Sequence, residues 1–282
     1  MTALAFFVVT LIGSVGAGVL GALLGLGGGI IVIPLLTLGL GINIHYAIGA
    51  SIVSVIATSS GAAATYVRDR ITNLRVGMFL EMGTTVGAIS GAYLANVIPT
   101  RALYIIFGVV LAYSGVIMFR KRKTEVPVDV PDSQMATKLR MHSSYYDQAI
   151  DKHVAYKVAG VFPALGLMYI AGVVSGLLGI GSGALKVPAM DIAMHLPIKV
   201  SSATSNFMIG VTAAASAGIY FERGDIQAII AAPVAIGVLI GAMLGTRLLV
   251  RLRGSVIRQI FVLVLVFICI EMIGRGLGIA LP

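Results

Sequence analysis

The stretch GLGGGIIVIP at residues 25–34 recurs in altered form as GIGSGALKVP at residues 179–188. In each copy, helix-breaking glycines stand inside an apolar stretch and are followed by an apolar run and a proline. Paired interruptions at corresponding positions of two halves are typical of transporters, in which unwound segments near the middle of the membrane contact the solute. The two copies therefore predict a duplicated chain and the place of its binding site.

The composition assigns the chain to the membrane. Of its 282 residues, 58% are hydrophobic, and the mean hydropathy of +1.02 excludes an ordinary soluble domain. Asp, Glu, Lys and Arg are absent before Arg68, so several segments of bilayer length precede the first of these charges. The N-terminus lacks the basic region of a signal peptide and is expected to be the first membrane segment. The single cysteine, Cys269, lies in an apolar run and is assigned to packing.

Apolar segments of spanning length predict most of the architecture. Six are clear: 47–67, 76–97, 102–119, 200–221, 226–250 and 257–280. Two further regions, 3–42 and 158–194, are too long for one span, and a glycine cluster divides each of them. The pieces that follow the clusters are too short to cross the hydrocarbon upright. We therefore predict an all-α polytopic membrane protein in which each half is a glycine-broken helical hairpin followed by three transmembrane helices.

The repeat divides the chain into three parts. The first transmembrane repeat is expected at 1–119, a linker at 120–157 and the second repeat at 158–282. The linker is polar and begins with RKRK at 120–123, which predicts a solvated cytoplasmic connector with a short surface helix within 132–153. A shift of 154 residues, from Gly25 to Gly179, aligns further matching residues, which supports an internal duplication. These aligned pairs are Ser51 with Ser205, Thr58 with Thr212 and Tyr66 with Tyr220.

The cations predict the orientation of the halves. If each hairpin enters and leaves on one side, three further spans give each half an odd number of crossings, so the second half is inverted relative to the first. Sixteen Lys and Arg residues then fall on the linker side and three on the other, while Lys186 lies in the membrane. This distribution agrees with the positive-inside rule. The linker is therefore expected to be cytoplasmic and both termini to be outside.

The glycine tips are the main candidates for substrate binding. A short helix that begins after each tip offers free N–H groups and the positive end of its dipole, so two converging tips favour an anion. Glycine also permits tight turns and a close approach to the main chain. Isolated glycines such as Gly108 and Gly237 are assigned to helix packing. The candidate tip residues are Gly27, Gly28, Gly29, Gly181, Ser182 and Gly183.

Lys186 follows the second tip by three positions. An unpaired ammonium in hydrocarbon costs several kcal/mol, so this side chain is expected to face a cavity, an anion or a carboxylate. Direct attraction of an anionic substrate is one interpretation. The alternatives are a structural pair with Asp191 or Glu81, or a side chain that extends towards the membrane interface.

Polar residues on the spans after the two hairpins complete the candidate site. Ser51 belongs to a stripe of small polar residues at helical spacing that also includes Ser54, Thr58 and Thr65, and Ser205 with Asn206 occupies the corresponding place in the second half. Hydroxyl groups can coordinate an oxyanion, but in membranes they also make routine helix contacts, so both roles stay open.

Ionisable groups inside the apolar regions are candidates for a proton relay. The acidic ones are Glu81, Asp191 and Glu271, the last of which can pair with Arg275. His45 and His195 adjoin the short helices and can titrate near neutrality. Each of these is more often a hydrogen-bonded structural residue, and none is selected as the coupling group.

Together, GLGGGIIVIP before a serine-bearing span, GIGSGALKVP before SSATSNF, and the polar linker resemble the TauE/SafE (sulfite exporter) family. The resemblance implies a transporter of small anions in a prokaryotic plasma membrane, with sulfite and organosulfonates such as sulfoacetate among the substrates. It also implies export driven by ion gradients. Ser182 and Lys186 depart from the pattern of the first copy. The glycines that match the family pattern are Gly25, Gly27, Gly28, Gly29, Gly179, Gly181 and Gly183.

The leading hypothesis is an alternating-access carrier whose anion lies between the two tips. An anion channel with the tips as its selectivity constriction is the alternative. An enzyme is disfavoured, because the sequence has no HExxH, no GxSxG and no closely spaced carboxylates within the apolar spans. The expected partners are a small anion, the lipid bilayer and a coupling ion, either a proton or sodium. No nucleic acid, cofactor or metal is expected.

Overall fold

The computed structural model describes residues 3–95, 97–120, 133–179, 181 and 183–278, which are mostly helical. In chain order the elements are α1 (Ala3–Leu24), α2 (Gly29–Pro34), the π-helical η1 (Leu35–Gly39), α3 (Ile44–Arg68), α4 (Leu74–Leu94), α5 (Thr100–Arg120), α6 (Gln134–Lys138), β1 (Ser143–Asp147), β2 (Lys152–Tyr156), α7 (Val161–Leu178), α8 (Gly183–Ala193), α9 (Ile198–Glu222), α10 (Ala228–Arg251) and α11 (Gly254–Gly276). The predicted helical class is confirmed, and the linker is the exception.

Asparagines set the starts of two long helices. Asn43 Oδ1 accepts the N–H of His45 at 3.0 Å before α3, and Asn73 Oδ1 accepts the N–H of Val76 at 3.1 Å before α4. Such a side chain satisfies an N–H group that has no partner inside the helix. Both helices therefore begin slightly before the apolar spans that the sequence predicts.

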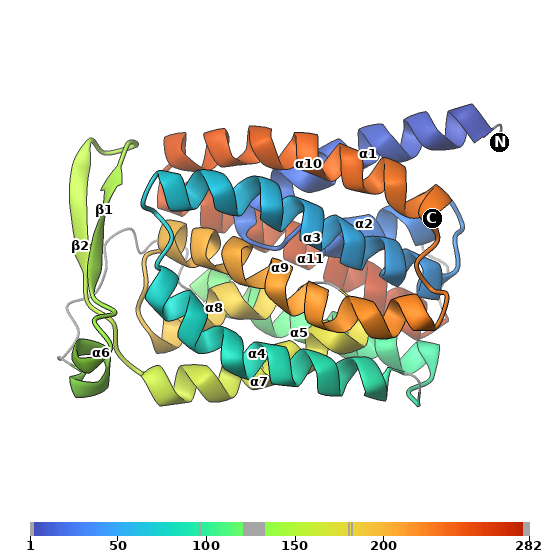
Figure 1. Cartoon of the computed structure of the whole chain (residues 1–282). Coiled ribbons are helices and arrows are strands. Elements are labelled where there is room, and N and C mark those ends of the chain that lie inside the picture. The colour runs from blue at the N-terminus through green and yellow to red at the C-terminus, as the bar shows by residue number, and fades with distance from the viewer. Residues whose placement is uncertain (1–2, 96, 121–132, 180, 182, 279–282) are drawn as a thin grey trace.

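The long helices run alongside one another as a bundle (Figure 1). The β1–β2 hairpin and α6 lie at one end of this bundle. The start of α1, the connection between α9 and α10, and the last turn of α11 lie at the opposite end. The two ends of the bundle are thus distinguished by the linker.

Five helices in the described part of the chain are long and apolar enough to cross a membrane. They are Leu4–Leu24, Ile44–Arg68, Val161–Leu178, Ala228–Arg251 and Ser255–Gly274. Three of them contain or largely overlap predicted spans, and the other two are the first arms of the predicted hairpins. The helices α4, α5 and α9, with 21, 21 and 25 residues, are of similar length, and their crossing of the membrane stays a prediction.

The two halves contain the same series of elements. The shift of 154 residues, from Gly25 to Gly179, carries the starts of α2, α3, α4 and α5 onto the starts of α8, α9, α10 and α11. Left-handed backbone recurs in the same way, at Gly41 and His195 and again at Arg70 and Gly224. The duplicated sequence is therefore matched by duplicated local structure.

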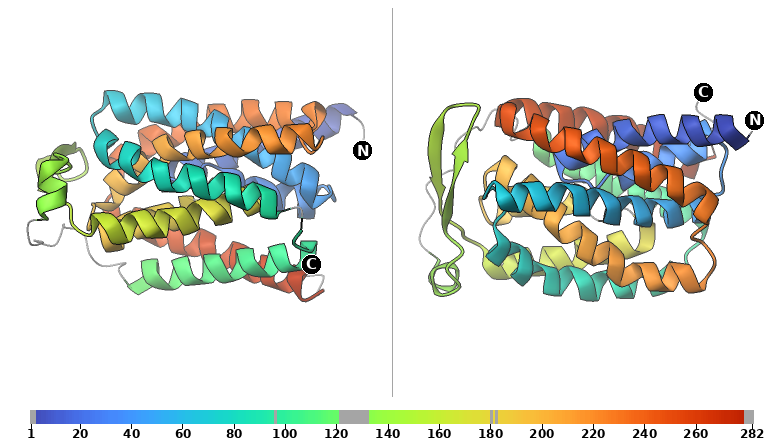
Figure 2. Two further views of the ribbon diagram at one scale, coloured as in Figure 1. Left: turned by 60° about the horizontal axis from the view of Figure 1, so that its bottom comes forward. Right: turned by 45° about the horizontal axis from the view of Figure 1, so that its top comes forward.

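Two corresponding pairs of helices pack the halves against each other. Helix α1 lies along α10, and α4 lies along α7, as the two views of Figure 2 show. Glycines bring the backbones close: a Cβ on Gly18 would lie 2.3 Å from the Val238 carbonyl oxygen, and one on Gly237 would lie 2.5 Å from that of Leu11. Small residues of this kind commonly permit helix association in membranes. The packing role predicted for Gly237 is confirmed.

The linker differs from the predicted connector with one surface helix within 132–153. Helix α6 spans only five residues, and β1 pairs with β2 as an antiparallel hairpin that aligns Ser143 with Tyr156. Asp147 starts the turn, because its Oδ1 accepts the N–H of Ala149 at 2.9 Å. Buried Tyr145 and Tyr156 favour strands over a helix. The predicted surface helix rested on the helix formers in this segment and did not take the tyrosines into account.

Buried contacts fix the hairpin to both halves. Lys199 Nζ of α9 donates to Asp147 Oδ1 at 2.7 Å, and both residues are buried. Asn73, which precedes α4, donates through Nδ2 to the Tyr156 hydroxyl at 3.0 Å. Burial, reinforced by the charge of Asp147, raises the pKa of the Tyr145 phenol, so this hydroxyl remains a donor to Asp147 Oδ2 at 3.1 Å. The described part of the linker, residues 133–157, is therefore docked against both halves.

Candidate functional site

The two glycine clusters form the turns between α1 and α2 and between α7 and α8. The left-handed residues in these turns are Gly25, Gly27, Gly28, Gly179 and Gly181, with φ angles between 65° and 77°. A side chain at such a residue adds strain, which explains the glycines. The first two correspond to the last two under the shift, so the two turns share left-handed backbone at these positions. Ser182, the counterpart of Gly28, lies outside the described residues.

Two serines tie each turn to the opposite half. Ser51 Oγ on α3 donates to the carbonyl oxygen of Gly179 at 2.8 Å, and Ser205 Oγ on α9 donates to that of Gly25 at 2.6 Å. Both serines are fully buried. The two bonds correspond to each other under the shift, so each long helix holds the turn of the other repeat. The structure thus brings Ser51 and Ser205 to the glycine turns, and substrate contact by these hydroxyls stays a prediction.

The two turns also touch each other. A Cβ on Gly183 would lie 2.1 Å from the carbonyl oxygen of Gly25, at the start of the other turn. Gly27 and Gly181 face the same two side chains, Val55 of α3 and Ile209 of α9. These apolar residues are themselves a corresponding pair. Val55 and Ile209 were not among the predicted site residues, because nothing in the sequence distinguishes them from other apolar helix residues.

The first turn uses some of its amides internally. The N–H groups of Leu26 and Gly27 donate to the Gly21 carbonyl oxygen at 2.9 and 3.3 Å. Gly28 lies beside Thr58, since a Cβ there would be 3.3 Å from Oγ1, and buried Gly29 begins α2. Gly27 is therefore better placed to shape the turn than to donate its N–H to a substrate.

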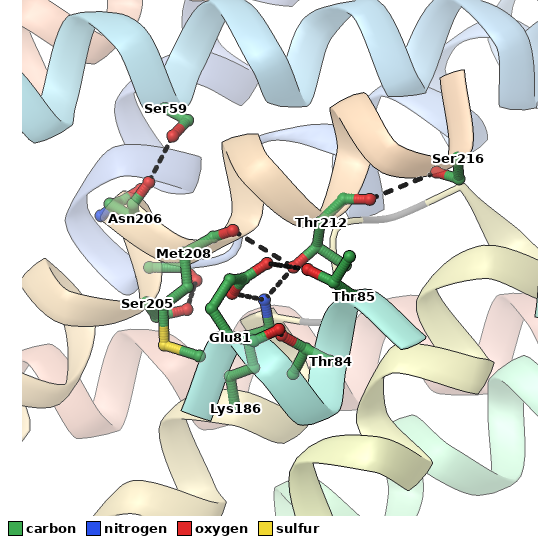
Figure 3. Close-up of polar contacts among 11 residues, drawn as sticks. Ser59, Glu81, Thr84, Thr85, Lys186, Ser205, Asn206, Met208, Thr212 and Ser216 are labelled. Atoms are coloured by element: carbon green, nitrogen blue, oxygen red, sulfur yellow. Dashed lines mark hydrogen bonds and ion pairs between the residues drawn. The ribbon is translucent and has the colours of Figure 1, made fainter. Parts of the chain in front are cut away.

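Asn206 supports the first turn from α9. Its Nδ2 donates to the Ala22 carbonyl oxygen at 2.7 Å and to the Ser202 carbonyl oxygen at 3.1 Å. The main-chain carbonyl oxygen of Asn206 accepts a hydrogen bond from the Ser59 hydroxyl at 2.5 Å (Figure 3). Within the described residues, Asn206 Oδ1 is buried and has no hydrogen-bond partner. This predicted site residue thus lies against the last turn of α1.

Other members of the polar stripe bond within their own helix. Ser54 Oγ donates to the Ser51 carbonyl oxygen at 2.7 Å, and Thr58 Oγ1 donates to the Ser54 carbonyl oxygen at 2.8 Å. Of the stripe, it is Ser51 that the structure connects to a turn. Ser54 and Thr58 donate within α3, and contact of their hydroxyls with a substrate stays a prediction.

Lys186 lies in the first part of α8 and is fully buried. Its Nζ donates to Thr212 Oγ1 at 2.5 Å and lies 3.4 Å from Glu81 Oε2, as Figure 3 shows. Thr212 in turn donates to Glu81 Oε1 at 2.6 Å. Of the alternatives that the sequence left open, the structure contains the pair with Glu81. Three helices, α4, α8 and α9, supply this cluster.

The remaining ionisable candidates are placed as follows. Asp191 is buried further along α8, and Glu271 lines an apolar cavity of about 400 Å³ between α1, α2 and α11. His45 lies in the first turn of α3, and His195 lies in the turn before α9. Among these relay candidates, Glu81 contacts the predicted site residue Lys186.

Two tyrosines support the helix ends beside the glycine turns, and the sequence did not predict them as site residues. Tyr66 donates its hydroxyl to the Ala22 carbonyl oxygen at 3.1 Å, and Tyr220 donates to that of Gly176 at 2.7 Å. Each bond holds the last turn of the helix that precedes a glycine turn. The alignment of Tyr66 with Tyr220 was the signal that could have revealed this role.

Comparison with known proteins agrees with this architecture. The sequence profile described as "Sulfite exporter TauE/SafE" matches residues 10–272. The "Probable membrane transporter protein YunE" of Bacillus subtilis (strain 168) is 27% identical over 213 residues, which cover 73% of this chain and 74% of that protein. A "Probable membrane transporter protein" of Xylella fastidiosa (strain 9a5c) is 30% identical over 189 residues, which cover 67% and 64%. No solved structure matches the chain.

The profile covers both glycine turns, both tied serines and the Glu81–Lys186–Thr212 cluster. Both relatives are named as probable membrane transporter proteins. Family, relatives and apolar helices agree on a multi-pass membrane protein. The chain belongs to the TauE/SafE (sulfite exporter) family of membrane transporters.

Proposed function

We propose that the chain is a secondary transporter that exports a small anion, such as sulfite or an organosulfonate like sulfoacetate, and that the anion binds where the glycine turns meet. The observation that carries the proposal is the reciprocal pair of hydrogen bonds from Ser51 to Gly179 and from Ser205 to Gly25. These bonds hold two unwound segments together between the halves. Backbone of this kind at membrane depth occurs where it is buried in protein or lines a cavity.

The surroundings of the turns favour a negative charge. Helix α8, with 11 residues, begins at Gly183 beside the first turn, so the positive end of its dipole points towards both turns. Lys186 adds an ammonium in the same part of α8. We propose a small anion because the described backbone around the turns is closely packed. The name of the family supports sulfite, and organosulfonates are the related anions that the resemblance implies.

Cations also gather at the linker end of the bundle. A cavity of about 420 Å³ between α3 and α10, beside Gln148 of the β-hairpin turn, is lined by Arg68, Arg247 and Arg251. Guanidinium groups bind oxyanions well and raise the local concentration of anions. Thr65 of the polar stripe lines the same cavity. We assign this cavity as the approach to the site from the cytoplasm, with the protein in a prokaryotic plasma membrane.

Alternating access follows if the halves are inverted repeats. In Figure 1, α1 begins at the end of the bundle opposite the β-hairpin, and α7 begins beside the hairpin. This arrangement supports opposite orientations of the two glycine-broken hairpins. Rocking of one half against the other then opens a shared central site to each side in turn.

Cysteine labelling checks the inversion. In a Cys269→Ser background, Asp69→Cys and Glu222→Cys each place one thiol in an exposed position near corresponding helix ends. A membrane-impermeant thiol reagent should label Asp69→Cys in inside-out vesicles and Glu222→Cys in right-side-out vesicles. Labelling of both from the same side would rule out inverted halves.

A binding screen tests the proposed substrate class. Purified protein is heated with sulfite, sulfoacetate, thiosulfate, taurine or acetate, and its unfolding temperature is followed. A bound anion at about 100 times its Kd should stabilise the protein by about 2.7 kcal/mol, whereas a solute that does not bind leaves the temperature unchanged. In liposomes, uptake of the best ligand should saturate and be stimulated by the same anion inside, which a channel does not show. Absence of stabilisation by every anion would refute the proposal.

A further inference from the structure

The cluster of Glu81, Lys186 and Thr212 is a charged unit in the interior of the helix bundle. The exposed fraction of Lys186 and of Thr212 is 0%, and that of Glu81 is 8%. Lys186 Nζ lies 2.5 Å from the Thr212 hydroxyl but 3.4 Å from the nearest Glu81 oxygen, so the ammonium contacts the hydroxyl more closely than the carboxylate. Figure 3 shows the three side chains converging from α4, α8 and α9. The contact between the charges is loose for a buried ion pair.

The positions that correspond to this cluster under the duplication carry no charges. Under the shift of 154 residues, Lys186 corresponds to Val32, Glu81 to Ala235 and Thr212 to Thr58. Val32 is fully buried in an apolar cluster with residues of α3 and α10. Apolar side chains therefore suffice to hold these helices. Because a buried ion pair seldom adds stability over apolar packing, the charges at Glu81 and Lys186 need another explanation.

Charge balance supplies that explanation. In the observed pair, the carboxylate neutralises the ammonium, so Lys186 is not available to a substrate anion. If Glu81 takes up a proton, an O–H bond forms, the carboxyl becomes neutral and Lys186 is left with an uncompensated charge inside the membrane. A monovalent anion restores neutrality. The site is then neutral in both states, with either a carboxylate or a substrate anion opposite the ammonium.

We infer that Glu81 is the proton acceptor of the transport cycle and that it competes with the substrate anion for Lys186. One proton and one monovalent anion bind together, cross together and are released together, after which Glu81 pairs with Lys186 again. Because this transfer is electroneutral, the anion leaves the cell when its own outward gradient exceeds the inward gradient of protons. Thr212 positions the carboxyl, since its hydroxyl contacts both partners. This inference rests on the proposed anion transport and assigns the proton as the coupling ion.

Few charged groups compete for this role. Helix α7, which packs against α4, contains no Asp, Glu, Lys, Arg or His. On α9 the ionisable charges are Lys199 and Glu222, at its two ends, and Lys199 pairs with Asp147. On α8, Asp191 lies five positions beyond Lys186. On α4 itself, Arg75 is exposed at the linker end and donates to the Arg140 carbonyl oxygen.

Reconstituted protein and methanesulfonate test the inference. This probe is a monovalent anion whose charge does not change between about pH 5.5 and about pH 8, so any effect of pH belongs to the protein. The native protein should bind it at least about tenfold more tightly at the lower pH. An inward proton gradient should drive uptake, and because a proton and a monovalent anion cross together, a membrane potential alone should not.

Two variants separate coupling from binding. Glu81→Gln imitates the protonated carboxyl, so it should bind methanesulfonate equally at both pH values and exchange it across the membrane, but a proton gradient should no longer drive accumulation. Lys186→Met should bind it at least about tenfold more weakly at both pH values. The matched control Glu222→Gln removes the same charge at an exposed helix end and should keep the native pH dependence.

A double variant covers the case in which Glu81→Gln does not fold. Glu81→Ala with Lys186→Val introduces the residue types found at the corresponding positions, Ala235 and Val32, so it should fold. If the pair were only structural, this variant would transport methanesulfonate, whereas we expect no transport. Transport by the double variant, or native pH dependence in Glu81→Gln, would overturn the inference. If the native protein binds anions but transports methanesulfonate without protons, proton coupling is refuted and the proposed function stands. If no anion binds, both the proton coupling and the proposed function are refuted.

Discussion

Gly183→Ala should reduce anion transport more than about tenfold, because it inserts a methyl group between the two glycine turns. A Cβ at this residue would lie 2.1 Å from the Gly25 carbonyl oxygen and 2.6 Å from Leu26 Cα, and both atoms are backbone. Neither atom can rotate away, so the turns must separate. Overpacking of this kind commonly costs about 1–3 kcal/mol, enough to displace the turns while leaving a protein that inserts. Uptake into liposomes, normalised to inserted protein, measures the effect.

Gly166→Ala is the matched control on α7. A Cβ there would have no other atom within 4 Å, apart from its own helix and chain neighbours, so the same substitution should be neutral for transport. Thermal unfolding of both variants shows whether a loss of transport reflects a loss of fold. Transport by Gly183→Ala at the native rate would mean that the contact between the turns is not needed for movement of the anion.

Lys199→Met should lower the free energy of unfolding by about 3–5 kcal/mol, because it leaves the carboxylate of Asp147 buried without its partner. The distance between Lys199 Nζ and Asp147 Oδ1 is 2.7 Å, and 2% of the Lys199 side chain is exposed. A second substitution, Asp147→Leu, should recover much of this loss because no lone charge then remains. Denaturant unfolding of purified protein measures the change.

Lys152→Met is the control for the charge itself. Lys152 lies on β2 of the same hairpin and is exposed, so its removal should change the free energy of unfolding by less than about 0.5 kcal/mol. If Lys199→Met were as mild as this control, the hairpin would not depend on the ion pair for its attachment.

Much of the candidate site could be predicted from the sequence, because duplication preserves spacing. The glycine turns and the Ser51–Ser205 pair follow from one shift of the chain. The partner of Lys186 did not follow, since Glu81 and Asp191 were equally acceptable until the packing of α4 beside α9 was known. Val55 and Ile209 could not be selected at all, because apolar residues next to a turn look like any other helix residue.

The linker shows a different limit of the sequence. Its residues include enough helix formers to predict a helix, yet cross-strand pairing and burial of two tyrosines favour a hairpin. That preference depends on contacts with Asn73 and Lys199, which belong to distant parts of the chain. The proton-relay candidates were likewise equivalent in the sequence, and only the three-dimensional contacts distinguish Glu81 from Asp191 and Glu271.

The packing of α1 against α10 also bears on how the protein is made in the cell. Helix α1 enters the membrane early in synthesis, but α10 is translated only after both glycine turns, the linker and most of the second half. Until then, the glycine face of α1 must be covered by lipid or by the insertion machinery. Membrane insertion and helix assembly are therefore separate events in time. A ribosome that stalls before α10 leaves a nascent chain whose first helix lacks its packing partner.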